Sequence, residues 1–155
     1  MSFRIRGLEP TPFRQLYGQS TAALAAAGIE RHVADCSPGF PDRVELRDAV
    51  PGESLLLLNY VHQPAANPYR ASHAIFVREG ALQAFDRVGE IPAALAIRPL
   101  SLRAFDAADR LVDAELAEGE QQAAVIERLL AEPRVAYLQA HFARPGCYAA
   151  RIERG

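Results

Sequence analysis

The hydrophobic segments of this chain are mostly short runs of strand-forming residues joined by tight turns rather than by helices. One such run follows the turn residues Pro51 and Gly52, and a second run ends at Gly80. Antiparallel strands can be joined by a short hairpin, whereas parallel strands need a long crossover connection. The sequence therefore predicts an α+β fold with a mainly antiparallel, twisted sheet and a few helices, and it disfavours a doubly wound parallel sheet.

The predicted helices lie mainly near the two ends of the chain. The clearest covers residues 119–132, where apolar side chains recur at the spacing of one helical face and Pro133 stops the helix. Thr11 and Ser20 are N-cap residues that predict two short helices near the N-terminus. Pro92 predicts one or two further helical turns. Most predicted strand pairs therefore have no helix between them.

Three patterns define the predicted strands. The continuous apolar run Leu55–Leu58 indicates a central strand that is buried on both faces. Two hairpins are predicted in the second half of the chain, with turns at 107–109 and 144–146. Another strand is expected to begin at Arg43, after a loop rich in proline and glycine.

Length and composition are those of one ordinary globular domain. A chain of 155 residues, half of them hydrophobic, can bury a core without a disulfide or a metal, so we expect a single α+β domain over residues 1–155. The net charge of −2 gives no electrostatic reason to expect nucleic-acid binding. The longest strongly apolar run, Leu55–Leu58, is far shorter than the roughly 20 residues of a membrane span, and the N-terminus lacks a signal-peptide pattern. We therefore expect a cytoplasmic protein that does not bind membranes.

The residue types present exclude several kinds of covalent chemistry. All 17 basic residues are arginines, which excludes a Schiff base on lysine and a lysine-dependent phosphate-binding loop. Cys36 and Cys147 are too few and too far apart for a disulfide framework or a cysteine-based zinc site, and we expect both thiols to be reduced. The sequence identifies no cofactor.

The first candidate site residues lie around the join between two predicted strands. Tyr60 and His62 project from the same face of the first strand, and His62 would lie nearly opposite His73 on the second. Tyr69 and Arg70 lie in the connecting loop, where side chains are free to face a ligand. These residues predict a polar site at the mouth of the hairpin.

Arg70 has two alternative roles. Its guanidinium can bind a carboxylate or a phosphate through two parallel hydrogen bonds, which would make the loop an anion site. Alternatively, Arg70 pairs with Glu79 or with backbone carbonyl groups across the loop, and then it only holds the loop in shape. The sequence does not distinguish these roles.

The second group of candidates lies in the last two predicted hairpins. Alternation along the strand places Tyr137, Gln139 and His141 on one polar face. Arg103 either lies on a solvated sheet face or enters the same polar region as His141. Cys147 would project away from His141, so a catalytic cysteine–histidine pair is disfavoured.

A zinc site formed by His62, His73 and His141 would leave an open position for water. It would require the two histidine-bearing hairpins to be neighbours, and no two of these histidines have the local spacing of a metal motif. We therefore expect no metal site and interpret each histidine as a strand-end residue bonded to backbone or water.

Several sequence blocks together resemble a known family: "FRIRGL", "SPGFPDRVEL", "GESLLLLNYVHQPAANPYRASHAIFVREG", "SLRAFDAADRLVDAE" and "VAYLQAHFARPGCYAARI". Over nearly its whole length the chain is similar to a bacterial family catalogued as domain of unknown function 1203, which carries no assigned reaction. The family pattern has Gly-Pro where this chain has His73 and Ala74, and this departure weakens a role for His73. The blocks that resemble the family contain Tyr60, His62, Pro68, Tyr69, Arg70, Arg103, His141, Gly146 and Cys147. Pro68 and Gly146 are best interpreted as residues that shape the backbone.

The function predicted from these residues is the binding of a small anionic or polar ligand between the central and C-terminal hairpins. His62 and His141 would supply hydrogen bonds or, in an enzyme, proton transfer, because histidine titrates near neutral pH. The ligand-binding residues would be Tyr60, Tyr69, Arg70 and Arg103. The alternative, from another class, is a non-catalytic interaction module or a homodimer that pairs through the same polar face or a sheet edge. Whether the protein is an enzyme stays open.

Overall fold

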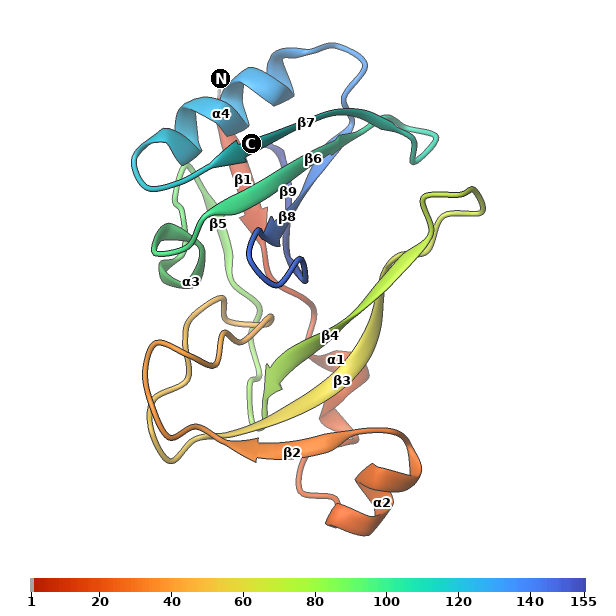
Figure 1. Ribbon diagram of the computed structural model, residues 1–155, viewed down its shortest axis with the longest axis vertical. Helices are drawn as coiled ribbons and strands as arrows, with labels where there is room; N and C mark the ends of the chain where they lie inside the picture. The colour runs from red at the N-terminus through yellow and green to blue at the C-terminus, as the bar shows by residue number, and fades with distance from the viewer. Residues whose placement is uncertain (1) are drawn as a thin grey trace.

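The computed structural model describes residues 2–155 and contains two antiparallel sheets, one above the other in Figure 1. The predicted α+β class is confirmed, with short helices beside the two sheets. The strands are β1 (Phe3–Arg6), β2 (Glu30–Val33), β3 (Ser54–Gln63), β4 (Ala71–Arg78), β5 (Asp86–Val88), β6 (Leu100–Phe105), β7 (Leu111–Ala117), β8 (Tyr137–Phe142) and β9 (Tyr148–Arg154). The helices are α1 (Thr11–Arg14), α2 (Thr21–Ala26), α3 (Ala93–Ala96) and α4 (Gln121–Ala131).

The order of the strands shows how the chain divides between the two sheets. The large sheet has six strands in the order β5-β1-β9-β8-β6-β7, and the small sheet has three in the order β2-β3-β4. The small sheet is built entirely from the segment between β1 and β5, so the chain leaves the large sheet after β1 and returns at β5. Both predicted hairpins in the second half are present, as β6–β7 and β8–β9.

Helix α4 lies over the large sheet on the side away from the small sheet (Figure 1). Its apolar face carries Ile126 and Leu130, which are fully buried against sheet residues such as Leu102 and Leu138. The helix lies within the predicted span and ends before Pro133, as expected. Among the helices within residues 2–155, none combines the length and the apolar character needed to cross a membrane.

The small sheet has its own core. Strand β3 is central, and its side chains enter two clusters: Leu56 and Leu58 pack with Phe13 of α1 and Leu24 of α2, while Leu55 packs in a separate cluster. The prediction that the Leu55–Leu58 strand is central and buried on both faces is therefore confirmed.

The strand predicted from Arg43 onward is wrong, because that segment forms a tight turn. The fully buried carboxylate of Asp42 accepts hydrogen bonds from the backbone N–H of Glu45, at 2.6 Å, and of Arg78, at 2.8 Å. An aspartate that accepts from backbone N–H groups in this way favours a turn over a strand. Burial raises the pKa of the Asp42 carboxyl.

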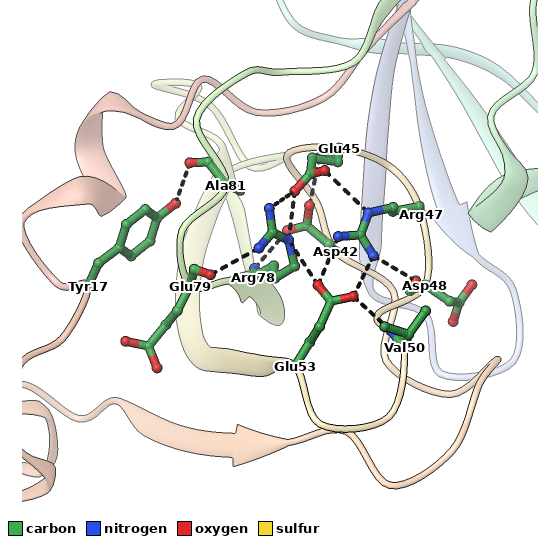
Figure 2. Close-up of polar contacts among 10 residues, drawn as sticks. All are labelled: Tyr17, Asp42, Glu45, Arg47, Asp48, Val50, Glu53, Arg78, Glu79 and Ala81. Carbon is green, nitrogen blue, oxygen red and sulfur yellow. Dashed lines mark hydrogen bonds and ion pairs between the residues drawn. The ribbon is translucent and has the colours of Figure 1, made fainter.

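Ion pairs fix the rest of this turn against β3 and β4 (Figure 2). Arg47 binds both carboxylate oxygens of Glu53, at 2.8 and 2.9 Å, and Arg78 binds the carboxylate of Glu45. Bidentate arginine–carboxylate pairs have strong directional preferences. They hold an irregular segment in one conformation, which sequence periodicity does not reveal.

Glu79, directly after β4, connects further segments of the small-sheet unit. Its carboxylate accepts hydrogen bonds from Arg31 Nε of β2 at 2.6 Å, from Ser54 Oγ of β3 at 2.6 Å, and from the backbone N–H of Gly18 at 2.9 Å. The hydrogen bond from Arg31 is the largest cause that lowers the pKa of Glu79 from 4.5 to about 2.

We expect Glu79→Gln to lower the free energy of unfolding at neutral pH by about 1–2 kcal/mol, because the charged acceptor is lost. Since the folded-state pKa lies below the usual value, this stabilisation is fully present above pH 4.5 and is lost as the pH falls toward 2. Urea unfolding of both proteins across this range should show the difference shrinking. Glu30→Gln, at a side chain 71% exposed, is the control and should leave stability nearly unchanged. A Glu79→Gln difference that persists at about pH 2 would contradict this account.

Candidate functional site

Three histidines from the two sheets lie together where the sheets meet. His62 comes from β3 and His73 from β4, whereas His141 comes from β8, and one ring nitrogen of each lies within 4.8 Å of the other two. The pairing of β3 with β4 shifts register between Tyr60 and Gln63, which is a bulge. A bulge re-aims the side chains around it, and here both His62 and Gln63 are buried. The two hairpins therefore adjoin, which a shared site of the kind predicted requires.

Hydrogen bonds tie the far end of the β3–β4 ribbon to the large sheet. The Asn67 side chain donates to the backbone carbonyls of Ala108 and Asp109 in the β6–β7 turn, at 3.0 and 3.2 Å. Gln63 donates to the hydroxyl of Tyr137 at 2.8 Å, and that hydroxyl donates to Asp109 at 2.6 Å. The loop and the turn therefore close one end of the site, as the adjacent tips in Figure 1 show.

Gln139 lies at the centre of the hydrogen bonds around the histidines. Its Oε1 lies 2.7 Å from His62 Nδ1, and its Nε2 donates to the backbone carbonyl of His62 at 2.9 Å. His73 Nδ1 lies 2.8 Å from His62 Nε2, and His141 Nδ1 lies 3.1 Å from the backbone carbonyl of Gly146. The sequence placed Gln139 and His141 on one polar face but did not assign this role to Gln139.

Burial keeps the histidines neutral at physiological pH. It is the largest cause that lowers the pKa of His62, of His73 and of His141, and the Arg103 guanidinium lowers each pKa further. The pKa of the fully buried His141 falls to about 3. A group that exchanges protons in catalysis works best with a pKa near the operating pH. His141 is therefore suited to hydrogen bonding or metal binding as a neutral imidazole rather than to proton transfer.

A pocket of about 240 Å³ adjoins the histidines and is lined by Tyr69, Arg103, His62 and His141. Arg103 thus enters the polar region of His141, one of the two placements considered from the sequence. Its Nε lies 3.3 Å from Ser101 Oγ, and within residues 2–155 no carboxylate pairs with this guanidinium. Burial lowers the pKa of Arg103 from its ordinary value. The pocket therefore contains a partly desolvated positive charge.

Tyr60 lies in a different cavity from Tyr69. A space of about 320 Å³ is lined by Tyr60, Tyr148 and His62, among others. The ring of Tyr148 stacks on His62, with centroids 5.1 Å apart and planes 10° from parallel. The two tyrosines expected to form the walls of one pocket are thus distributed between two cavities, and His62 lines both.

Arg70, like Tyr60, is a predicted ligand-binding residue that does not line the 240 Å³ pocket. The side chain of Asn67 accepts a hydrogen bond from the backbone N–H of Tyr69 at 2.9 Å, which tightens the loop. The exposed Arg70 then donates to the carbonyl of Pro64 at 3.1 Å. Glu79, the alternative partner, binds Arg31 instead. This contact corresponds to the structural role considered from the sequence, in which Arg70 holds the loop in shape by donating to a backbone carbonyl.

Sequence reasoning missed a second region, in which several arginine side chains line a cavity. This cavity of about 440 Å³ is lined by Arg43, Arg98, Arg144, Phe142 and Cys147. Arg43 is only 2% exposed. Cys147 lies on this side of the β8–β9 hairpin, as predicted, and its Sγ is 3.1 Å from Arg43 Nη2. Both cysteines are free thiols, in agreement with expectation.

Comparison with known proteins identifies a family. A family model described as "Protein of unknown function (DUF1203)" matches residues 39–154, a span that includes every strand from β3 to β9 and all three clustered histidines. No curated protein and no solved structure matched the chain. Because the matched span covers most of the chain, the protein belongs to the DUF1203 family.

Proposed function

We propose that the protein binds a small anionic ligand in the 240 Å³ pocket between the β3–β4 ribbon and the large sheet. Arg103 would bind the anionic group, and Tyr69 would form an apolar wall. His62 and His141 would line the pocket as neutral imidazoles. The observation that carries this proposal is the partly buried guanidinium of Arg103, which lines the pocket and has no carboxylate partner among the described residues.

The burial of Arg103 supports an anion over a neutral ligand. A charge taken out of water is costly unless it is paired. Arg31 and Arg47 have carboxylate partners, and the more deeply buried Arg43 donates to two backbone carbonyls. Among the described residues, the Arg103 guanidinium hydrogen-bonds only to Ser101 Oγ. An anionic ligand would supply the missing counter-charge. A guanidinium is also well suited to bind a carboxylate or a phosphate through two hydrogen bonds.

The size of the pocket limits the ligand. Pockets for drug-sized molecules have volumes of roughly 300–1,000 Å³, and this pocket is smaller, at about 240 Å³. It is also partly apolar, because Phe105 and Leu111 contribute to its walls. A small organic carboxylate or phosphate with a short apolar part fits these conditions.

We expect Arg103→Gln to weaken anion binding by roughly 10–100-fold, because a charge-assisted hydrogen bond contributes about 1.5–3 kcal/mol. Inorganic phosphate and a series of short-chain mono- and dicarboxylates are the probes, titrated by calorimetry against the purified protein. Arg110→Gln is the matched control, since Arg110 is exposed near the β6–β7 turn and does not line the pocket. Equal affinities of the wild type and Arg103→Gln for every probe that binds would overturn the proposal.

The interaction-module alternative predicts a different outcome. In that case no probe binds, and size-exclusion chromatography with light scattering shows a stable dimer whose dissociation constant rises in Tyr69→Ala. A monomer that binds an anion through Arg103 favours the ligand-binding function.

A further inference from the structure

The histidine cluster presents more hydrogen-bond acceptors than donors, and this imbalance indicates a cation. We propose that His62 Nε2, His73 Nδ1 and His141 Nε2 form a binding site for one divalent transition-metal ion of the zinc class. The expectation from the sequence was no metal site, because no two of these histidines have a local metal-motif spacing and the site requires the two hairpins to be neighbours. The site shares His62 and His141 with the anion pocket but does not require that pocket to bind a ligand.

The protonation pattern of His62 follows from Gln139. Because Gln139 Nε2 donates to the backbone carbonyl of His62, its Oε1 must be the atom that faces the His62 ring at 2.7 Å. A carbonyl oxygen can only accept, so His62 Nδ1 carries the ring proton. His62 Nε2 therefore presents a lone pair toward His73.

His141 has a lone pair with no donor to satisfy it. Both ring nitrogens of His141 face carbonyl oxygens that can only accept, Nδ1 at 3.1 Å from Gly146 and Nε2 at 3.3 Å from Gln139, but a neutral ring has one proton. The shorter contact places this proton on Nδ1. His141 Nε2 then faces Gln139 Oε1 at 3.3 Å, which places two acceptors against each other in a fully buried position. A metal ion bound to Nε2 satisfies this lone pair without a second proton.

The hydrogen bonds made by the ring nitrogens that would not bind the metal are typical of a metal site. A histidine that binds a metal almost always donates its other ring N–H to a carbonyl or a carboxylate, which fixes the tautomer and the ring orientation. Gln139 Oε1 and the Gly146 carbonyl accept these bonds from His62 and His141. His73 is half-buried, so its proton can move from Nδ1 to Nε2, where it can be donated to solvent.

The distances allow one ion after small side-chain adjustments. Zinc–nitrogen bonds of about 2.0–2.1 Å in a tetrahedron place the ligand nitrogens roughly 3.3 Å apart. His73 Nδ1 and His62 Nε2 lie 2.8 Å apart, and the cluster's ligand atoms lie within 4.8 Å of one another. The required movements are on the order of 1 Å, which rotations about side-chain bonds can supply.

The surrounding charge determines the fourth ligand. Three histidines leave one position open on a tetrahedral ion. Arg103 opposes the binding of a bare cation, but it favours an anionic fourth ligand such as hydroxide or a carboxylate, which lowers the total positive charge. The pocket beside His62 and His141 has room for such a ligand.

The test is a titration of chelator-treated protein, free of any affinity tag, with zinc chloride in a calorimeter. We expect one ion per chain and a rise in the thermal unfolding midpoint on zinc addition, because an ion that binds only the folded state stabilises it. Loss of a residue that only hydrogen-bonds a metal ligand weakens metal binding by roughly 10–100-fold, and His73→Ala, which removes a ligand itself, should weaken zinc binding by more than this. Zinc should also no longer raise the thermal unfolding midpoint of the His73→Ala protein. Cobalt as a probe should give the visible absorption of a tetrahedral site in the wild type and not in His73→Ala.

His32→Ala is the matched control, because His32 is the fourth histidine, lies on β2 and pairs with Glu30. It should bind zinc as the wild type does. Equal zinc affinities for His73→Ala and the wild type, or the absence of one-to-one binding, would overturn the proposal. Circular dichroism of each variant confirms that it is folded.

The same variants separate this inference from the anion proposal. Arg103→Gln should lose anion binding while it binds zinc at least as tightly as the wild type, since a repelling charge is removed. His73 does not line the pocket, so chelator-treated His73→Ala should still bind the anionic probe. Zinc binding without anion binding, or the reverse, would leave one proposal standing and refute the other.

Discussion

Replacing Arg43 with methionine should lower the free energy of unfolding by about 2–4 kcal/mol, because two backbone carbonyls lose their donors. Arg43 Nε donates to the carbonyl of Tyr148 at 2.7 Å, and Nη1 donates to the carbonyl of Pro41 at 2.6 Å. The guanidinium also lies 4.9 Å from the centre of the Phe142 ring, in a cation–π contact. One side chain thus joins the turn before β3 to the β8–β9 hairpin of the other sheet.

Two opposing effects decide the size of this loss. Burial lowers the pKa of the Arg43 guanidinium, which shows that desolvation disfavours the charge, and its removal offsets part of the cost. However, methionine fills similar apolar space and donates no hydrogen bond, so each buried carbonyl without a donor costs about 1–3 kcal/mol. The second effect is larger because two carbonyls are involved.

Urea unfolding followed by circular dichroism measures the change. An unaltered slope of the unfolding free energy against urea concentration would show that both proteins expose the same surface on unfolding. Arg144→Met is the matched control, since Arg144 lines the same cavity but is exposed. Its stability should stay within about 0.5 kcal/mol of the wild type. A variant of Arg43 that is as stable as the wild type would contradict this structural role.

The elements formed by residues close together in the chain could be predicted from the sequence. Hairpins β6–β7 and β8–β9 and helix α4 each follow from local periodicity and turn residues. The division into two sheets could not be predicted, because it depends on pairings between distant segments. An example is β1 with β9, which places Phe3 beside Arg154. Nothing in either strand's own sequence specifies its partner.

The candidate site shows the same limit. Alternation within β8 correctly placed Gln139 and His141 on one face, next to Arg103 of the paired strand β6. Arg70 lies outside the pocket because a turn at Asn67 redirects the loop, and a single hydrogen bond of this kind has no periodic signal. Arg43 was missed for a related reason: it lies in a turn of irregular backbone, where no alternation predicts that a charged side chain is buried.

Gly7→Ala should be one of the most destabilising single changes in the chain, with a loss of about 3 kcal/mol. Gly7 follows β1, where the chain leaves the large sheet. A Cβ atom added there would lie 2.0 Å from the carbonyl oxygen of Val44. That oxygen accepts the backbone N–H of Phe85 at 2.8 Å, and Gly7 itself donates to the carbonyl of Phe85 at 2.9 Å. The clash is with fixed backbone, so the outgoing and returning segments must separate and these bonds must weaken.

Thermal unfolding should show the effect as a lower midpoint, by about 2–4 °C for each kcal/mol in a chain of this size. Gly39→Ala is the matched control, because its added Cβ would clash with the thiol of the exposed Cys36, a small side chain that can move away, and would meet backbone only at an ordinary contact distance of 3.9 Å. Its midpoint should change little.

The histidine cluster takes His62 and His73 from one sheet and His141 from the other, so a folded Gly7→Ala protein should also bind zinc more weakly than Gly39→Ala. Equal stability of the two variants would show that the crossing at Gly7 does not hold the sheets together.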